Sequence, residues 1–491
     1  MIEDAVKIHD KTQFEIKLNY KFEKKKKDAS YEVETYFFLP NSLGVNRHTL
    51  RKVNFYDGVQ NYIRLKTPVY NLEQICKETE SPFVRTKNTY EILAEKNNEQ
   101  TIELYEYQTK MFANIFAAAI RRNTYFVQSL TKIDEIPNII LRHINSIREI
   151  SVAFRSLKSI ITIVTVDEEE RTIHSFADEY LSLLIEKYTF KLLEYLKRSN
   201  ITGTDVMQNG LLELIKDEVN YRKKNNYTSI SNEKSDNEEF MFRFSVLKKY
   251  FESVLFLDAN REKEGWLLEQ VLFGIAAGLA MLFATAIAFF SQSIYGSLTM
   301  QLFVVLVISY IFKDRIKELM RFSLTKRVFK FLYDDKTILF VDKRYKVGII
   351  RGSFNFMKWK NLSKLILSIR KKYRSKIFDN KFSEEKIILF KKKISLYPKF
   401  YNRMFKELQI DYITDIFRFD VSTLTRKMDN PRKPIFTLTP DGYKKTLGRR
   451  VYHVNLIIKY VEQKNTILHR FRLILTRNGI KRIEPVTSET Y

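Results

Sequence analysis

The feature that most constrains this chain is an uncharged window near its middle. From Gln270 to Phe312 there are 43 residues without one Asp, Glu, Lys or Arg, although charged residues make up 29% of the chain. Val271–Phe290 supplies 20 residues, which at about 1.5 Å per residue give about 30 Å, the thickness of a bilayer's hydrocarbon core. Ser291-Gln292-Ser293 is typical of a turn, and Ile294–Phe312 is a second apolar run of 19 residues. The sequence therefore predicts a transmembrane helical hairpin over 266–312; a hairpin buried in a large soluble protein is the alternative.

The flanking charges predict the orientation of this hairpin. Arg261 and Lys263 precede the first run. Six basic residues follow the second run, namely Lys313, Arg315, Lys317, Arg321, Lys326 and Arg327. The turn between the runs is uncharged, so the positive-inside bias places both long tails in the cytoplasm. No secretory signal peptide precedes the hairpin, and we expect a multi-pass protein of the cytoplasmic (inner or plasma) membrane with both termini in the cytoplasm.

Small and polar residues in the two runs predict close helix packing. Gly274 and Gly278 form a GxxxG motif. A second ridge on the same run consists of Ala277, Ala280, Ala284 and Ala288. Small residues let helix backbones approach closely in lipid, either within the hairpin or between copies of the chain, and Gln301 in the second run is able to hydrogen-bond across such an interface. Two ridges on one helix leave one for another subunit, so a homo-oligomer is possible.

The excess positive charge of the chain lies entirely after the second run. Residues 1–269 contain 40 basic and 41 acidic residues, whereas residues 313–491 contain 44 and 17, a net charge of +27. A field of this size attracts a polyanion. Beneath a membrane the lipid bilayer itself offers anionic lipid headgroups, which gain about 1 kcal/mol for each Lys or Arg near the surface. Nucleic acid is the other candidate, because it releases counterions on binding.

One segment of the basic region combines three prolines with paired cations. Pro431, Pro434 and Pro440 lie in Arg426–Arg450 and predict a loop. The candidate anion-binding residues of this loop are Arg432, Lys433, Lys444, Lys445, Arg449 and Arg450. Phe436 and Tyr443 offer flat surfaces of the kind that single-strand binders use for stacking. A merely solvated loop is the alternative.

Hydrophobic periodicity divides the rest of the chain and predicts an α+β fold. Residues 1–100 are expected to contain strands, because Phe14–Phe22 and Tyr31–Phe37 each alternate apolar and polar residues, and these two strands are expected to pair as a hairpin. Residues 101–265 are expected to be helical, with a polar loop at 219–239; Thr172–Arg198 is the clearest helix. The basic region 313–491 mixes both periods, with strands expected at 451–461 and 467–476 before an Asn478-Gly479 turn.

No catalytic or metal-binding motif is visible. The six His and the single Cys76 show no close spacing suited to a metal, and neither a Walker A loop, nor GxGxxG, nor GxSxG occurs. We therefore expect no cofactor and no metal. The sequence favours a non-enzymatic, two-span membrane scaffold, sensor or effector whose basic domain engages anionic lipid and which self-associates through its spans. A membrane-tethered nucleic-acid binder and an enzyme with an unrecognised site are the alternatives.

Overall fold

The computed structural model describes residues 4–21, 29–77, 79–130, 135–162, 166–199, 205–230, 236–262, 264–296, 299–328, 332–341, 345–372, 385–397, 412–462 and 465–490. The chain forms two compact units. The sheet unit comprises Met1–Ile63, Asp258–Met404 and Thr414–Tyr491, and the helical unit comprises Arg64–Leu257 and Phe405–Ile413. The units thus divide the chain differently from the four consecutive regions expected from the sequence, because the N-terminal strands and the basic C-terminal region belong to one unit.

The helical unit is built from long amphipathic helices. Its elements are α2 (Gln74–Lys77), α3 (Pro82–Glu95), α4 (Glu99–Ser129), α5 (Ile136–Ser156), α6 (Lys158–Ile161), α7 (Glu168–Arg198), α8 (Asp205–Lys224), α9 (Glu238–Glu252) and the 3-10 turn η3 (Ser253–Leu255). α7 packs against α4 and α8, and its N-terminus carries Glu168, Glu169 and Glu170, which suit the positive end of the helix dipole. The helix expected at Thr172–Arg198 is confirmed.

The polar loop expected at 219–239 is partly wrong. α8 continues as far as Lys224, and α9 begins at Glu238. The composition of this segment suggested a loop, but the apolar side chains of Leu211, Leu214 and Ile215 are buried and hold α8 against the unit. Burial of one face therefore extends the helix into a polar sequence.

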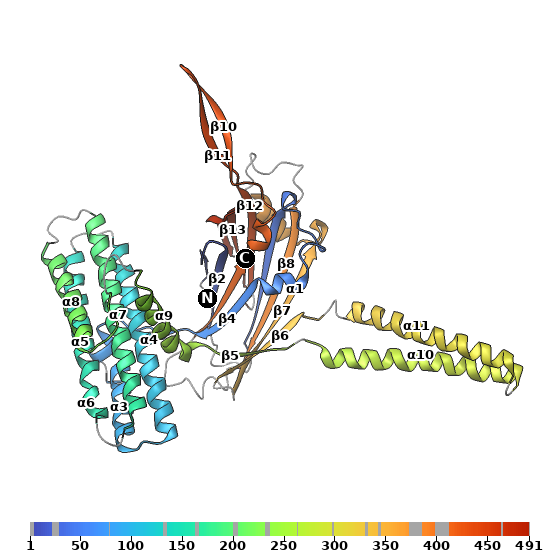
Figure 1. Cartoon of the computed structure of the whole chain (residues 1–491), viewed down its shortest axis with the longest axis horizontal. Coiled ribbons are helices and arrows are strands. Elements are labelled where there is room, and N and C mark those ends of the chain that lie inside the picture. The colour runs from blue at the N-terminus through green and yellow to red at the C-terminus, as the bar shows by residue number, and fades with distance from the viewer. Residues whose placement is uncertain are drawn as a thin grey trace. The chain divides into compact units, whose positions relative to one another are not determined.

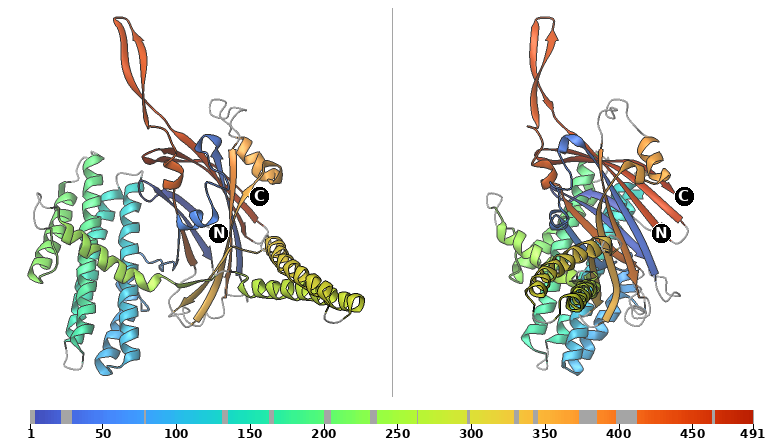
Figure 2. Two further views of the ribbon diagram at one scale, coloured as in Figure 1. Left: turned by 45° about the vertical axis from the view of Figure 1, so that its right-hand side comes forward. Right: turned by 90° about the vertical axis from the view of Figure 1, so that its right-hand side faces the viewer.

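The sheet unit contains a four-stranded sheet and an eight-stranded antiparallel sheet (Figure 1, Figure 2). The four-stranded sheet has the order β1 (Asp4–Ile8), β2 (Gln13–Lys21), β9 (Tyr412–Asp420) and β4 (Val59–Leu65). The eight-stranded sheet has the order β14 (Gly479–Thr490), β13 (Asn465–Thr476), β12 (Tyr452–Glu462), β3 (Ala29–Pro40), β8 (Glu385–Leu396), β7 (Tyr345–Met357), β6 (Asp335–Val341) and β5 (Asp258–Glu262). The unit also holds α1 (Lys52–Asp57), α12 (Lys364–Lys372), α14 (Ser422–Thr425) and the 3-10 turns η1 (Asn41–Leu43) and η4 (Trp359–Asn361). The mixture of helices and sheets confirms the α+β class.

The strands β2 and β3 form as predicted, but they do not pair with each other. β2 lies in the four-stranded sheet and β3 lies between β12 and β8 in the eight-stranded sheet. The rings of Tyr20 on β2 and Tyr31 on β3 are 5.0 Å apart and tilted. The expected hairpin is therefore wrong, because the two strands meet through buried side chains and not through backbone hydrogen bonds.

An aromatic core joins the two sheets. Phe55 of α1 lies within 6.2 Å of the rings of Phe37, Phe354, Phe390 and Phe419. These rings come from β3, β7, β8 and β9, so both sheets contribute. The opposite face of the eight-stranded sheet is covered by α12, whose Ile366 and Ile369 pack against Phe38 and Ile387. The residues that follow α12, 373–384, lie outside the described part.

The uncharged window forms two adjacent helices, α10 (Trp266–Tyr295) and α11 (Met300–Val328), which pack side by side (Figure 1). The turn predicted at Ser291-Gln292-Ser293 is wrong, because α10 continues to Tyr295. The break comes after Gly296, a position with a φ of 74° that favours glycine. As a result α11 begins six residues later than the second predicted run. Among the described helices α10 alone has the length and apolar composition to cross a membrane, so the two-span hairpin is not confirmed.

Candidate anion-binding and membrane-contact site

The proline-containing segment 426–450 is not a loop but a two-stranded antiparallel ribbon. β10 (Arg432–Thr439) and β11 (Gly442–Arg449) pair only with each other, and this ribbon is seen apart from the other strands in Figures 1 and 2. Pro440 and Asp441 form the two-residue connection, and Gly442 follows with a φ of 131°. A Pro-Asp-Gly sequence is a turn signal. Pro434 is tolerated within β10 because both strands of a ribbon are edge strands.

The ribbon brings together all six residues predicted to bind an anion. Arg432 pairs with Arg449 at the base, and Lys444 and Lys445 lie opposite Thr437 and Phe436 near the turn. The two remaining residues are Lys433, which faces Gly448, and Arg450, which follows β11. Partners across a strand pair share one face of the sheet. The face that holds Arg432 and Arg449 therefore also holds Lys445.

Five of these six cations lack an acidic partner among the described residues. Arg450 forms an ion pair with Asp429, with 2.8 Å between Nη1 and Oδ2. The structure shows no such pair for Arg432, Lys433, Lys444, Lys445 or Arg449. Every position of β10 is exposed, and so are six of the eight positions of β11, the exceptions being Thr446 and Gly448. The ribbon thus presents concentrated, unneutralised positive charge.

Elsewhere in the sheet unit, acids of the N-terminal strands neutralise three cations of the basic C-terminal region. Lys391 and Lys459 form ion pairs with Glu32 and Glu34 of β3. Arg418 of β9 pairs with Glu15 of β2 at 2.7 Å. Burial raises the pKa of the Glu15 carboxyl, but Lys17 and Arg418 outweigh burial, so that the pKa is lowered. The net charge of residues 313–491 therefore overstates what is available to a partner. The five ribbon cations Arg432, Lys433, Lys444, Lys445 and Arg449 are among those that this pairing does not neutralise.

The ribbon also exposes large apolar side chains, most of which the sequence analysis missed. Leu438 is 90% exposed and Leu447 59% exposed, and Ile435 lies on the opposite face. The rings of Phe436 and Tyr443 are 5.8 Å apart in an edge-on contact. A weak signal for a strand was present in Phe436-Thr437-Leu438-Thr439, where apolar residues alternate with threonine before Pro-Asp-Gly, but the three prolines favoured a loop. Apolar and basic side chains therefore lie side by side on the ribbon, with Phe436, Leu438 and Tyr443 close to Lys444 and Lys445 near the turn.

On α10, the two small-residue ridges face different surroundings. The residues buried on α10 are Leu272, Ala276, Ala280 and Ser291, so the alanine side of the helix packs on α11. Ala277, Ala284 and Ala288 are half-buried at the edge of this contact. Gly274 and Gly278 are exposed, and a Cβ atom added at either would meet nothing within 4 Å. Since two residues correspond to about 200° around a helix, the GxxxG motif lies opposite the contact with α11.

The apolar helices are covered by very little protein. Only 17% of the most apolar stretch of α10 is buried. Val271, Leu282 and Phe289 are 57%, 67% and 69% exposed. Gln301, near the start of α11, is exposed as well, and no hydrogen bond joins it to α10 among the described residues. A soluble core helix would be mostly buried, so this surface requires a cover other than the described chain.

In the described part of the chain, no group of three or more His, Cys, Asp or Glu is placed to hold a metal ion. No protein-family model, curated protein or solved structure matches this chain. The ribbon and the apolar helix pair are therefore the candidate functional surfaces of the chain.

Proposed function

We propose that this chain is a non-enzymatic, membrane-anchored protein that binds anionic lipid headgroups. In this proposal α10 and α11 are embedded in the bilayer, both termini lie in the cytoplasm, and the β10–β11 ribbon docks on a membrane surface. The single observation that carries the proposal is the exposed ribbon, which combines five unpaired cations with large apolar side chains. A scaffold, sensor or effector role at the membrane is consistent with such a surface.

The chemistry of the ribbon favours lipid over nucleic acid. Ile435, Leu438 and Leu447 are aliphatic, so they are able to enter an acyl layer but offer no flat surface for a base. The two aromatic rings, Phe436 and Tyr443, contact each other edge-on, whereas single-strand binders stack successive bases on open aromatic faces. Apolar side chains beside basic ones are typical of segments that lie at a membrane interface.

The charges supply a substantial binding free energy. Each Lys or Arg close to an anionic surface contributes about 1 kcal/mol, so five unpaired cations contribute about 5 kcal/mol at low ionic strength. This is about a 10³- to 10⁴-fold difference in affinity. Insertion of Leu438 and its apolar neighbours adds to binding on neutral and anionic membranes alike. The preference for anionic over neutral lipid is therefore determined by the cations and not by the apolar side chains.

The uncharged part of α11 is shorter than the hydrocarbon core of a bilayer. α11 is uncharged only from Met300 to Phe312, 13 residues that span about 20 Å, against about 30 Å of hydrocarbon. Beyond this point Arg321 lies over the ring of Phe273, with 3.7 Å between its guanidinium carbon and the ring centre. Two complete crossings therefore require Lys313 and Lys317 to extend their charged ends towards the headgroups and the bilayer to thin locally.

We also propose that the exposed side of α10 mediates self-association. Gly278→Ile should disrupt oligomers in the membrane while leaving the α10–α11 pair intact, because its side chain enters open space. Ala280→Ile is the matched variant: Ala280 is 1% exposed, so the larger side chain should separate α10 from α11. Cross-linking in native membranes measures the loss of oligomers in Gly278→Ile. Resistance to protease measures the separation of α10 from α11 in Ala280→Ile. Unchanged oligomers in Gly278→Ile would exclude the glycine side as the interface.

The ribbon is tested with the full chain reconstituted in nanodiscs of neutral phosphatidylcholine. Binding to separate vesicles is measured with and without phosphatidylserine, and single-stranded RNA is measured in parallel. Replacing Arg432, Lys433, Lys444, Lys445 and Arg449 together by Gln should reduce binding to the anionic vesicles by about 10³-fold at low salt. The matched control carries five exposed lysines of the helical unit replaced by Gln: Lys87, Lys96, Lys197, Lys223 and Lys224.

Three results would contradict the proposal. The first is an equal loss of vesicle binding in the ribbon variant and in its control, which would indicate a diffuse charge effect. The second is binding to neutral vesicles as tight as to anionic ones. The third is tighter binding to RNA than to anionic vesicles, which would favour the membrane-tethered nucleic-acid binder.

A further inference from the structure

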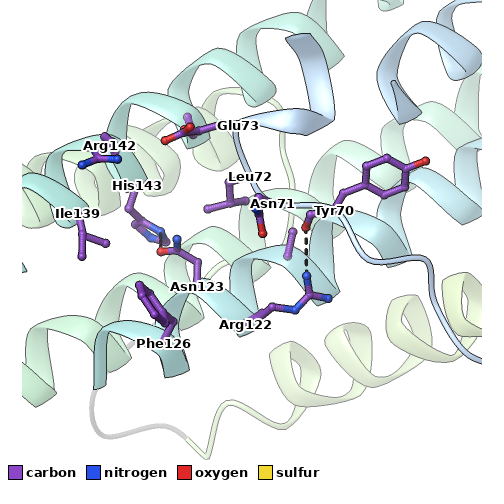
Figure 3. Close-up of a pocket in the computed structure, with 12 residues that line it drawn as sticks. Tyr70, Asn71, Leu72, Glu73, Arg122, Asn123, Phe126, Ile139, Arg142 and His143 are labelled. Carbon is purple, nitrogen blue, oxygen red and sulfur yellow. Dashed lines mark hydrogen bonds between the residues drawn. The ribbon is translucent and has the colours of Figure 1, made fainter. Parts of the chain in front are cut away.

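The helical unit contains a cavity that no part of the proposed membrane function uses. It has a volume of about 550 Å³ and lies between α4, α5 and the segment before α2 (Figure 3). Small-molecule sites have volumes of about 300–1,000 Å³ and combine apolar walls with a few polar groups. The cavity lies wholly within the helical unit, since all of its lining residues belong to 64–257.

The lining divides into an apolar wall and a polar group. Leu72 from the segment before α2, Phe126 from α4 and Ile139 from α5 supply apolar surface. The charged side chains are Arg122 of α4, Arg142 of α5 and Glu73, which precedes α2. In Figure 3 Arg122 lies on the side of Tyr70 and Asn71, whereas Arg142 lies beside His143. The cavity therefore carries two permanent cations against one acid.

Arg122 is the group that points to a ligand. Its side chain is half-buried, and its Nη1 donates one long hydrogen bond of 3.4 Å to the carbonyl oxygen of Tyr70. Burial and the neighbouring Arg121 lower the pKa of its guanidinium, which still remains a cation at neutral pH. No carboxylate of the described residues lies within ion-pair distance. A half-buried guanidinium with spare donors and no acid beside it is a site for an anion.

His143 does not add charge to the cavity. Its Nδ1 lies 2.8 Å from Oδ1 of Asn123, an acceptor, so Nδ1 is assigned the proton. Burial lowers the pKa of this imidazole to about 4, which leaves the ring neutral at physiological pH. The preference for an anion therefore comes from the arginines, and the imidazole with Asn123 forms a neutral polar wall.

We infer that this cavity binds a small organic anion with an apolar body, such as an aromatic or branched aliphatic carboxylate. The carboxylate meets the guanidinium of Arg122, which presents parallel donors suited to two oxygens. The apolar body lies against Leu72, Phe126 and Ile139. Arg142 lies at the exposed side of the cavity and attracts the anion as it enters.

The inference is tested by fluorine NMR on the full chain in nanodiscs, with 4-(trifluoromethyl)benzoate as probe. The uncharged 4-(trifluoromethyl)benzamide has nearly the same shape and reports partitioning into lipid. We expect saturable binding of the benzoate at about 1 mM or below, and binding of the benzamide at least tenfold weaker. Arg122→Gln should weaken the benzoate at least tenfold, because a charge-assisted hydrogen bond is lost.

Two variants complete the test. Arg121→Gln is the matched control, since Arg121 is the adjacent residue on α4 but does not line this cavity, and it should bind the benzoate normally. Ile139→Trp fills the cavity and should abolish binding while circular dichroism remains that of a folded helical unit. Absence of saturable benzoate binding, equal binding of the benzamide, or equal losses in Arg122→Gln and Arg121→Gln would each overturn the inference.

Discussion

The ion pair between Lys392 and Asp415 provides the sharpest test of how the sheet unit is held together. Lys392 lies on β8 of the eight-stranded sheet and Asp415 on β9 of the four-stranded sheet. Lys392 Nζ donates to both carboxylate oxygens of Asp415, at 2.7 and 3.0 Å, and to Asn61 Oδ1 at 3.2 Å. The two side chains are only 5% and 1% exposed. The pair is therefore a buried charge link between the sheets.

Asp415→Asn should be strongly destabilising, because it keeps the shape of the side chain but leaves the ammonium of Lys392 without a counter-charge. Removing one partner of a buried pair costs about 3–5 kcal/mol. With a urea m-value of about 2–3 kcal/mol per M, the unfolding midpoint of the sheet unit should fall by about 1–2 M. The double variant Lys392→Met with Asp415→Leu should be closer to the parent than Asp415→Asn is, since no unpaired charge remains.

The chain offers a reporter and a control for this measurement. It has two tryptophans, Trp266 and Trp359. In a Trp266→Phe background the fluorescence of Trp359 reports on the sheet unit, where its indole Nε1 donates to the carbonyl oxygen of Glu385. Glu484→Gln breaks the exposed pair between Arg482 and Glu484 and should cost less than about 1 kcal/mol. If Asp415→Asn lost no more unfolding free energy than this control, the buried ion pair would not hold the sheet unit together, because the result would mean that water solvates Lys392.

Three further predictions concern other parts of the chain. Burial lowers the pKa of His143 and of His174 to about 4. Because the imidazoles of the unfolded chain take up protons near pH 6.5, the helical unit should lose stability as the pH falls from about 6.5 to about 4. Thermal melts followed by circular dichroism should show a smaller acid-induced loss of stability in His174→Gln than in the parent. Burial, followed by the charge of Glu149, raises the pKa of Cys76 to about 12, so alkylation by iodoacetamide at pH 8 should be far slower than that of a small free thiol, and an equal rate would contradict this. In a Cys76→Ser background, Thr299→Cys at the turn between α10 and α11 should react with an impermeant maleimide added outside intact cells, whereas labelling only after permeabilisation would contradict two complete crossings.

The sequence predicted most elements that depend on residues close together in the chain. The alternation at Phe14–Tyr20 and the 3.6-residue period of Thr172–Arg198 both reflect burial of one face, and both elements form. The Asn478-Gly479 turn joins β13 and β14 as expected, with a φ of 121° at Gly479. The uncharged window was likewise visible, because the absence of charge is a property of composition. Local period and composition were sufficient for these features.

The tertiary structure alone decided which segments meet. No local signal shows that β3 lies between β12 and β8, more than 300 residues away, nor that acids of β2 and β3 neutralise C-terminal cations. The position of the break between α10 and α11, and the burial of Ala280 while Gly278 stays exposed, depend on the packing of one helix on the other. Strand pairing and helix packing are determined by contacts between residues distant in sequence, and periodicity carries no information about the identity of a partner. For the same reason the exposure of the β10–β11 ribbon, on which the proposed function depends, was visible only in the folded chain.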